Sequence, residues 1–256
     1  MKCVDLNCDM GELPEAIANG TQEALMRYVT SANIACGGHA GDEQTMRATV
    51  EQALRHKVAI GAHPGYEDRD HFGRIELQLS YQEIEASVER QIRVLDAIAQ
   101  EFGAPIIHVK PHGALYNQAA RERQIARAIA DGVRRWRTGV ILVGLAGSVM
   151  LAEFRAAGFR TAAEAFADRR YEPDGSLRPR TFRDALITDP QQAATQALQI
   201  VERSAVTAAN GVAIHLTAQT LCLHGDTPGS PQIAAVIHAR LTAANMSLAA
   251  LNEAVL

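Results

Sequence analysis

The stretch IIHVKPHGALY, residues 106–116, passes from two apolar residues into a run that carries three ionisable groups. Alternate side chains of a β-strand share one face, so His108 and Lys110 are expected to point to the same side. Pro111 cannot continue a central ladder, and the strand should end there. His108, Lys110 and His112 would then gather at the carboxyl end of a strand, where α/β enzymes keep their chemistry. The simpler alternative is that these groups are only solvated.

Composition limits the class of protein. The chain has 256 residues, 47% of them hydrophobic, and a formal net charge of −4. This length fits one barrel-sized domain or two small ones. Because no repeat, low-complexity segment or long linker breaks the chain, we expect one domain over residues 1–256. Without a long basic run, neither nucleic acid nor a membrane is an expected partner. We expect a cytoplasmic protein, because no signal-peptide core or membrane span is recognisable. Its four cysteines form no Cys-x-x-Cys pair, which favours buried, inert thiols.

Apolar runs alternate with amphipathic runs along most of the chain. Such alternation predicts a parallel sheet with right-handed crossovers, whether open or closed into a TIM-like barrel. The expected strands are residues 3–8, 31–36, 58–62, 106–110, 140–143, 161–166 and 220–223, with an extra strand at 211–216. The expected helices are about residues 22–29, 42–56, 80–102, 121–136, 190–204 and 231–243.

Ionisable residues recur where the expected strands end. In the first strand Asp5, Asn7 and Asp9 share one face, which must meet a ligand, other polar groups or water, because unpaired buried charge is costly. Asp42 is expected to cap a helix, which leaves His39 as the functional residue of its loop. If the sheet closes, one cavity at the carboxyl ends should be lined by Asp9, His39, His63, Lys110, His112, Asp168 and His224.

Six strings together resemble one known family. They are DLNCDMGE (5–12), SANIACGGHAGD (31–42), GAHP (61–64), VKPHGALYN (109–117), FADR (166–169) and CLHGD (222–226). They are similar to the LamB/YcsF family. The resemblance implies a seven-stranded (β/α) barrel related to glycoside hydrolase and polysaccharide deacetylase barrels. It also implies the A subunit of an ATP-dependent 5-oxoprolinase, which opens the lactam of 5-oxo-L-proline to L-glutamate and yields ADP and phosphate. ATP would be a co-substrate with Mg²⁺, and subunits B and C would be partners.

Roles for the candidate residues follow from chemistry and position. ATP is hypothesised to phosphorylate the lactam oxygen before water attacks the ring carbon. Histidine suits proton transfer to the ring nitrogen, and cations suit the developing negative charge. The candidates are Asp9 and Asp226 as bases, His112 and His224 as proton carriers, Lys110 and Arg169 at the negative charge, His39, His63 and Asp168 completing the ring, and Asn7, Tyr116 and Arg169 for substrate binding.

Two other functions stay open. A metal-dependent amide hydrolase or deacetylase could use Asp and His at several strand ends to hold Zn²⁺ or Mn²⁺. It ranks lower, and no tightly bound structural metal is expected, because no Cys-x-x-Cys pair is present. Alternatively, the chain only binds substrate and partner subunits catalyse. Since His112 follows Pro111, it is expected at the exposed mouth, where His112→Ala would leave stability nearly unchanged.

Overall fold

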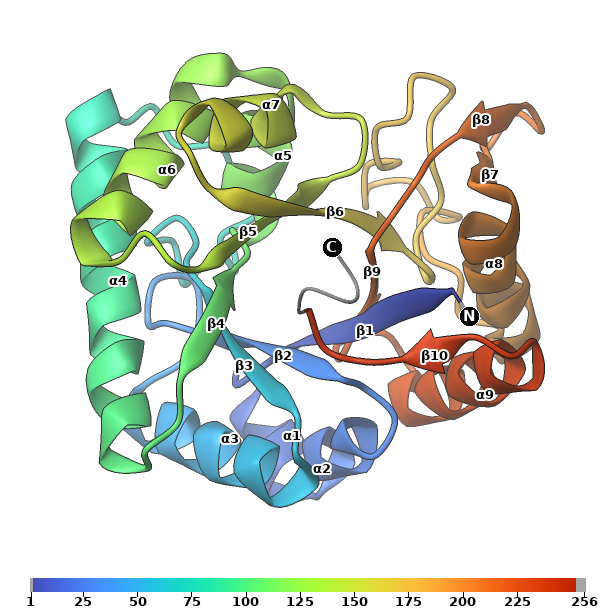
Figure 1. Ribbon diagram of the computed structural model, residues 1–256, viewed down its shortest axis with the longest axis horizontal. Helices are drawn as coiled ribbons and strands as arrows, with labels where there is room; N and C mark the ends of the chain where they lie inside the picture. Colours follow the sequence, from blue (N-terminus) through green and yellow to red (C-terminus); the bar gives the residue numbers. More distant parts are fainter. Residues whose placement is uncertain (1, 252–256) are drawn as a thin grey trace.

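The computed structural model describes residues 2–251, and its centre is a closed parallel barrel (Figure 1). The strands are β1 (Cys3–Met10), β2 (Ser31–Ala35), β3 (Ala59–His63), β4 (Ile106–Val109), β5 (Ile141–Leu145), β6 (Arg160–Phe166) and β9 (Thr220–His224). Each pairs in parallel with the next in this order, and β9 pairs back onto β1. The predicted seven-stranded barrel is therefore confirmed.

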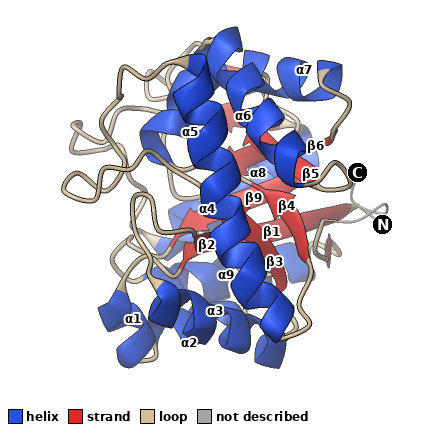
Figure 2. Ribbon diagram, turned by 90° about the vertical axis from the view of Figure 1, so that its left-hand side faces the viewer, coloured by secondary structure: helices blue, strands red, loops and turns tan. Residues whose placement is uncertain are grey.

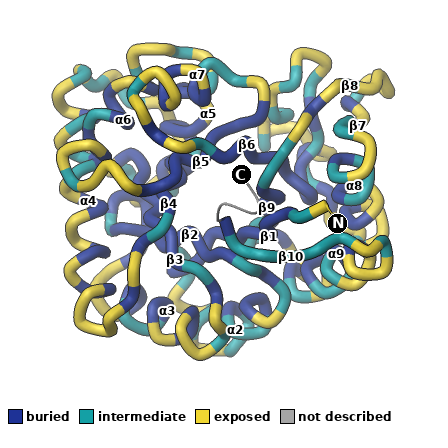
Figure 3. Tube along the Cα trace, viewed as in Figure 1, coloured by how far each residue is buried: buried dark blue, intermediate teal, exposed yellow. Residues whose placement is uncertain are grey.

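Helices surround this barrel (Figure 2), and their exposed residues lie toward the outside of the molecule (Figure 3). In α4 the apolar positions Ile84, Val88 and Ile92 recur at helical spacing and are buried against the sheet. The expected cap at Asp42 is confirmed, because its side chain accepts from the Thr45 backbone in a reciprocal capping box. The helices are α1 (Pro14–Ala18), α2 (Thr21–Met26), α3 (Glu43–His56), α4 (Tyr81–Glu101), α5 (Gly113–Arg121), α6 (Arg123–Trp136), α7 (Val149–Ala156), α8 (Pro190–Arg203) and α9 (Ser230–Ala243).

Within residues 2–251, none of these helices is both long enough and apolar enough to cross a membrane.

Two local expectations need correction. The helix expected from about residue 121 is preceded by another one, because α5 begins at Gly113 and ends directly before α6. Strand β1 runs to Met10 rather than stopping at residue 8, since Asp9 still pairs with Asn33 on β2 and with His224 on β9. The extra strand expected at residues 211–216 is confirmed as β8 (Ala213–His215), which lies outside the barrel and pairs antiparallel with the short β7 (Ala205–Thr207).

The interior of the barrel changes character along its axis. At the amino ends of the strands, Ile141, Val143 and Ala162 pack around Leu251, and β10 (Ser247–Leu248) pairs with β1 beside them. Above this apolar plug, the inward positions become polar and remain buried, beginning with Asp5 on β1. The polar face predicted for the first strand therefore looks into the barrel.

Candidate functional site

A cavity of about 1090 Å³ opens at the carboxyl ends of the strands. Five of the seven residues expected to line one cavity do so, and they are Asp9, His63, Lys110, His112 and His224. His39 and Asp168 are buried behind this wall, in contact with His112 and His224 respectively. The structure thus brings all seven to one end of the sheet, five in the wall of the cavity and two behind it.

Lys110 and Asp9 form an ion pair on the floor of the cavity. The Lys110 Nζ atom lies 2.9 Å from Asp9 Oδ1, 3.0 Å from Glu164 Oε1 and 3.0 Å from Cys222 Sγ. Burial alone would lower the pKa of Lys110, but the charges of Asp9, Cys222 and Glu164 outweigh it and raise that pKa well above its usual value. Lys110 is therefore a fixed positive charge beneath any molecule in the cavity.

Asp9 is correspondingly held as a carboxylate. Burial alone would raise its pKa, yet the neighbouring His63 and Lys110 hold the pKa of Asp9 well below its ordinary range. Asn33 donates from Nδ2 to Asp9 Oδ1 at 2.8 Å, and the His108 Nε2 atom lies 2.8 Å from Asn33 Oδ1. This hydrogen-bond network fixes the Asp9 carboxylate below the cavity.

Asn7 belongs to the layer beneath the cavity. Its Nδ2 atom donates to Glu164 Oε1 at 3.0 Å and to Thr220 Oγ1 at 2.6 Å, while its Oδ1 accepts from Asn33 at 2.7 Å. Asn7 does not line the cavity, unlike Tyr116 and Arg169, which were expected to bind substrate with it. Its geometry therefore suits positioning of the floor rather than direct contact with a substrate.

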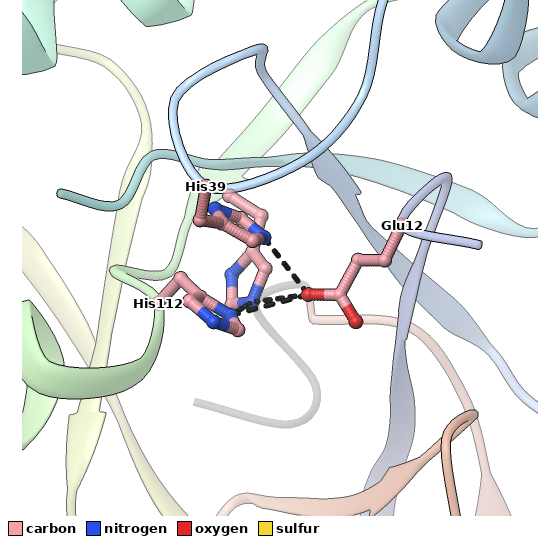
Figure 4. A group of neighbouring side chains, drawn as sticks. Glu12, His39 and His112 are labelled. Carbon is pink, nitrogen blue, oxygen red and sulfur yellow. Dashed lines mark hydrogen bonds and ion pairs between the residues drawn. The ribbon is translucent and has the colours of Figure 1, made fainter. Parts of the chain in front are cut away.

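Three histidines and Glu12 form a compact buried cluster at one side of the cavity. Glu12 Oε1 lies 2.9 Å from His39 Nε2, 3.1 Å from His112 Nδ1 and 3.8 Å from His63 Nε2. The His39 and His112 rings are stacked, with centroids 3.5 Å apart and planes 1° from parallel. Figure 4 shows Glu12 reaching across from its own loop toward this stacked pair.

The protonation states in this cluster follow from burial. Burial and the nearby His112 lower the pKa of His39 to about 3, and burial also lowers the pKa of His112. Burial opposes ionisation of Glu12, but hydrogen bonds and charges from His112 and His39 outweigh it and lower the pKa of Glu12.

The expectation that His112 is exposed at the mouth is wrong, because only 5% of it is accessible. Helix α5 and the Phe72 carbonyl enclose it.

His224 and Asp168 pair at the opposite wall. The Asp168 carboxylate lies 3.0 Å from His224 Nδ1 and accepts at 2.9 Å from the His224 backbone and from Thr227 Oγ1. Burial would raise the pKa of Asp168, yet His224 and Thr227 hold it below its usual value. The His224 ring stacks on Phe166 at 5.5 Å. Asp168 thus orients a histidine that faces the cavity, as a carboxylate does for a proton-transferring imidazole.

The remaining candidate carboxylate, Asp226, is engaged by arginines. Arg74 and Arg180 reach Asp226 Oδ2 at 2.5 and 3.1 Å. Burial opposes ionisation, but these cations and His224 lower the pKa of Asp226. Asp226 is outside the cavity lining, whereas Arg74, Arg180 and Arg169 are part of it. Burial and Arg180 lower the pKa of Arg169 to about 10, which still leaves this guanidinium charged at neutral pH.

Glu12, Asn33 and Glu164 take part in the site but were not among the candidates. Glu12 follows Gly11, whose φ of +73° turns the chain at the end of β1. The strand before it was expected to end at residue 8, and Glu12 was not singled out. Asn33 and Glu164 sit within strands that are otherwise largely apolar. A polar residue at an inward position of a buried strand was the signal that could have identified both.

Comparisons with known proteins give a consistent result. The model of the LamB/YcsF family matches residues 4–255. A Chloroflexus aggregans protein, named as the A subunit of 5-oxoprolinase, is 48% identical over 97% of this chain and 98% of its own length. The crystal structure of a lactam utilization protein from Thermus thermophilus has a TM-score of 0.90 and 43% identity, covering 98% of this chain and 100% of that one.

A more distant structure shares the fold alone. The peptidoglycan deacetylase PdaC from Bacillus subtilis, in a mutant form, has a TM-score of 0.50 and 15% identity over 99% of this chain and 89% of that chain. The expected relation to polysaccharide deacetylase barrels is confirmed at the level of the fold.

Proposed function

This chain belongs to the LamB/YcsF family, and from that membership we propose that it is the A subunit of an ATP-dependent 5-oxoprolinase. The observation that carries the proposal is the cavity floor, where buried Lys110 and ionised Asp9 lie side by side between two walls of histidine. A lactam amide is a poor electrophile. Opening it requires charge stabilisation at oxygen, a base for water and a proton for nitrogen, and these groups offer all three.

In the proposed reaction, the lactam oxygen takes the γ-phosphoryl group of ATP, which is bound with Mg²⁺, and ADP leaves. Water then adds to the ring carbon, the ring carbon–nitrogen bond breaks, and the nitrogen takes a proton. A second water hydrolyses the resulting acyl phosphate to glutamate and phosphate. Asp9 would take the proton from water, His112 or His224 would supply one to nitrogen, and Lys110 would stabilise the charge on oxygen.

Support for an anion in the cavity comes from its far wall. Arg169 and Arg180 line it together with Gly147 and Ser148, which precede helix α7. The Ser148 hydroxyl is buried, and within residues 2–251 it has no hydrogen-bond partner. A helix N-terminus and guanidinium groups both favour phosphate. These groups are few for holding a γ-phosphate in line with a carbonyl oxygen, so subunits B and C are proposed to complete the nucleotide site.

A second candidate function is favoured by a specific observation. The Glu12, His39, His63 and His112 cluster has the donor types of a catalytic metal site, which a metal-dependent amide hydrolase would need. The third possibility is a chain that only binds substrate. The three differ in what turnover requires, namely ATP with partner subunits, a metal ion alone, or catalytic groups in the partners.

The test is to measure glutamate and ADP release from the purified chain, and again after adding subunits B and C. We expect little or no release from the chain alone, with or without ATP, and coupled release of both products from the complex. Equal rates in the two assays would refute the dependence on partners. ADP release without glutamate from the chain alone would place the nucleotide site here.

A variant of this chain tests whether the chain contributes catalytic groups to the complex or only binds the substrate. In the complex, His112→Ala should lower turnover by about 10²-fold or more, the usual contribution of a general acid or base. The matched control is His71→Ala, because the His71 side chain is 58% exposed on a loop. Circular dichroism should accompany the assay, since His112 is buried. Near-normal turnover of His112→Ala would give this residue a structural role only.

A further inference from the structure

Backbone carbonyls decide which ring nitrogens carry protons in two of the clustered histidines. His63 Nδ1 lies 2.7 Å from the Lys110 carbonyl oxygen, and His112 Nε2 lies 2.9 Å from that of Phe72. A carbonyl oxygen only accepts, so both of these nitrogens must donate. In a neutral imidazole the other nitrogen then holds a lone pair. His63 Nε2 and His112 Nδ1 are therefore both acceptors when the two rings are neutral, whereas a protonated His63 would donate from Nε2 to Asp9 Oδ2, 3.3 Å away.

The two nitrogen atoms that carry these lone pairs lie in contact with each other. His112 Nδ1 and His63 Nε2 are 2.9 Å apart, and both also face the Glu12 carboxylate. His39 Nε2, 2.9 Å from the same Glu12 oxygen, can give its proton to Glu12 but does not resolve the contact between the other two rings. With neutral rings, three electron-rich atoms thus converge in a buried place, an arrangement that is unfavourable unless a proton or a metal ion supplies positive charge between them.

We propose that Glu12, His39, His63 and His112 together bind one divalent transition-metal ion of the Zn²⁺ class. Their four ligand atoms all lie within 4.8 Å of one another. Ligands held about 2.0–2.2 Å from a tetrahedral zinc ion lie roughly 3.4 Å apart. The contacts from Glu12 Oε1 to the three rings, at 2.9, 3.1 and 3.8 Å, bracket that separation.

The surroundings of the cluster support the same interpretation. Metal-binding histidines commonly donate their other ring nitrogen to a backbone carbonyl or carboxylate, as His63 and His112 do here. The stacked His39 and His112 rings would repel each other if both were protonated, whereas neutral rings can stack and keep their lone pairs. Backbone packs closely behind them, because a Cβ added at Gly65 would lie 2.7 Å from His39 Nδ1. The rings are therefore held in place before any ion binds.

Spacing along the chain could not reveal this site. Its members come from four different strands, since His63 ends β3 and the others lie in the loops after β1, β2 and β4. The sequence-based expectation of no tightly bound structural metal rested on motif spacing, and it stands opposed to the proposal. Glu12, His63 and His112 line the cavity, so the ion would be within reach of a bound amide and could polarise its oxygen or a water molecule. That catalytic use rests on the proposed function, with His224 rather than His112 as the proton donor, whereas ion binding does not.

The experiment uses the full chain, stripped of metal with a chelator and titrated with Zn²⁺ and with Co²⁺. We expect about one equivalent bound, a visible Co²⁺ absorption of the tetrahedral type, and a melting temperature that rises with Zn²⁺. Glu12→Gln, which keeps the shape and removes the charge, should weaken binding at least about 10-fold, and His39→Ala should remove the Co²⁺ spectrum. His238→Ala, on α9 outside the cluster, is the matched control and should bind like the wild type.

Two results would overturn the proposal. One is a wild-type chain that binds less than about a tenth of an equivalent and gives no Co²⁺ absorption. The other is Zn²⁺ binding that Glu12→Gln and His39→Ala leave unchanged. If a variant does not fold, the imidazole ¹⁵N chemical shifts of the wild type are recorded before and after adding Zn²⁺. The proposal requires the shifts of three ligand nitrogens to change. Turnover of 5-oxoproline by a metal-stripped complex would leave the proposed function standing while removing the catalytic use of the ion.

Discussion

Asp5 shows how burial acts on a single carboxyl group in this barrel. It is fully buried and accepts hydrogen bonds from the hydroxyl groups of Thr30, Ser31 and Thr220. Burial is the dominant influence and raises the pKa of Asp5 from 3.8 to about 6. Asp9, four positions along the same face, is instead held ionised by His63 and Lys110. Inward positions of one strand thus differ in charge state because only one of them has cationic neighbours close by.

This difference predicts a pH-dependent stability. The native state binds the Asp5 proton more tightly than the unfolded state, so this stabilisation is complete below pH 3.8 and is lost as the pH rises through about 6. Asp5→Asn does not titrate there. The free energy of unfolding of the wild type, relative to Asp5→Asn, should therefore fall by up to about 3 kcal/mol between pH 4 and 7. Urea denaturation of both proteins across this range is the measurement, and a constant difference would contradict the shifted pKa.

Individual site residues were predictable only in part. Strand alternation correctly placed Asp5, Asn7 and Asp9 on one polar inward face, and His108 with Lys110 on another. Exposure was not predictable, because the burial of His112 depends on residues far away in sequence that pack over it. Glu12 was missed for a related reason, since a left-handed turn at Gly11 directs it back toward the barrel.

The loop after β3 illustrates how an element controls the site. Gly65 follows His63 and Pro64, and its backbone touches both stacked histidines. A Cβ at this position would lie 2.7 Å from His39 Nδ1 and 3.1 Å from His112 Cβ. Glycine is therefore the residue that lets this loop approach the rings.

We expect Gly65→Ala to displace the stacked pair. Turnover in the complex should fall by about 10²-fold, the loss typical of a roughly 1 Å misplacement of catalytic groups. Gly139→Ala is the matched control, because a Cβ there meets nothing within 4 Å, and it should keep wild-type turnover. Steady-state assays of the two variants make the comparison. Equal turnover would mean that the position of the rings does not matter to the reaction.

Elements were more predictable than their ends. Periodicity identified α4, and the sequence around Asp42 identified the start of α3, because both signals are local. Helix α5 was missed, since it has 9 residues and begins at the glycine of a Pro-His-Gly run that is typical of a turn. Its burial against α6 and α7 stabilises it, and such tertiary contacts leave no local pattern.

At the scale of the whole molecule, the apolar plug closes the amino end of the barrel. Leu251 is 4% exposed and packs among Ile141, Val143 and Ala162. Leu251→Ala should lower the free energy of unfolding by about 2–5 kcal/mol, the usual cost of such a cavity. Leu54→Ala, at a site 42% exposed, should change it by less than about 0.5 kcal/mol. Urea denaturation measures both, and a Leu251→Ala value as small as that of the control would mean the plug contributes little.

The architecture itself was the most predictable feature. Alternating apolar and amphipathic runs indicated parallel strands with helical crossovers, and ionisable residues at their ends indicated which end carries the site. Closure between β9 and β1 was not readable from local pattern, because it joins residues far apart in the chain, such as Asp5 and Thr220. The metal-type cluster is hidden for the same reason, since barrel closure and not sequence proximity brings its members together.

The filled interior of the barrel restricts how molecules can enter and leave the cavity. Within residues 2–251, the barrel is occupied from the Leu251 plug up through the polar layers to Lys110, so the cavity offers a passage only toward the loops at the carboxyl ends of the strands. An incoming molecule and an outgoing one must then use the same opening in turn. A partner protein seated across those loops would have to open or release once per catalytic cycle, and the pace of that movement would set an upper limit on how fast the assembly works.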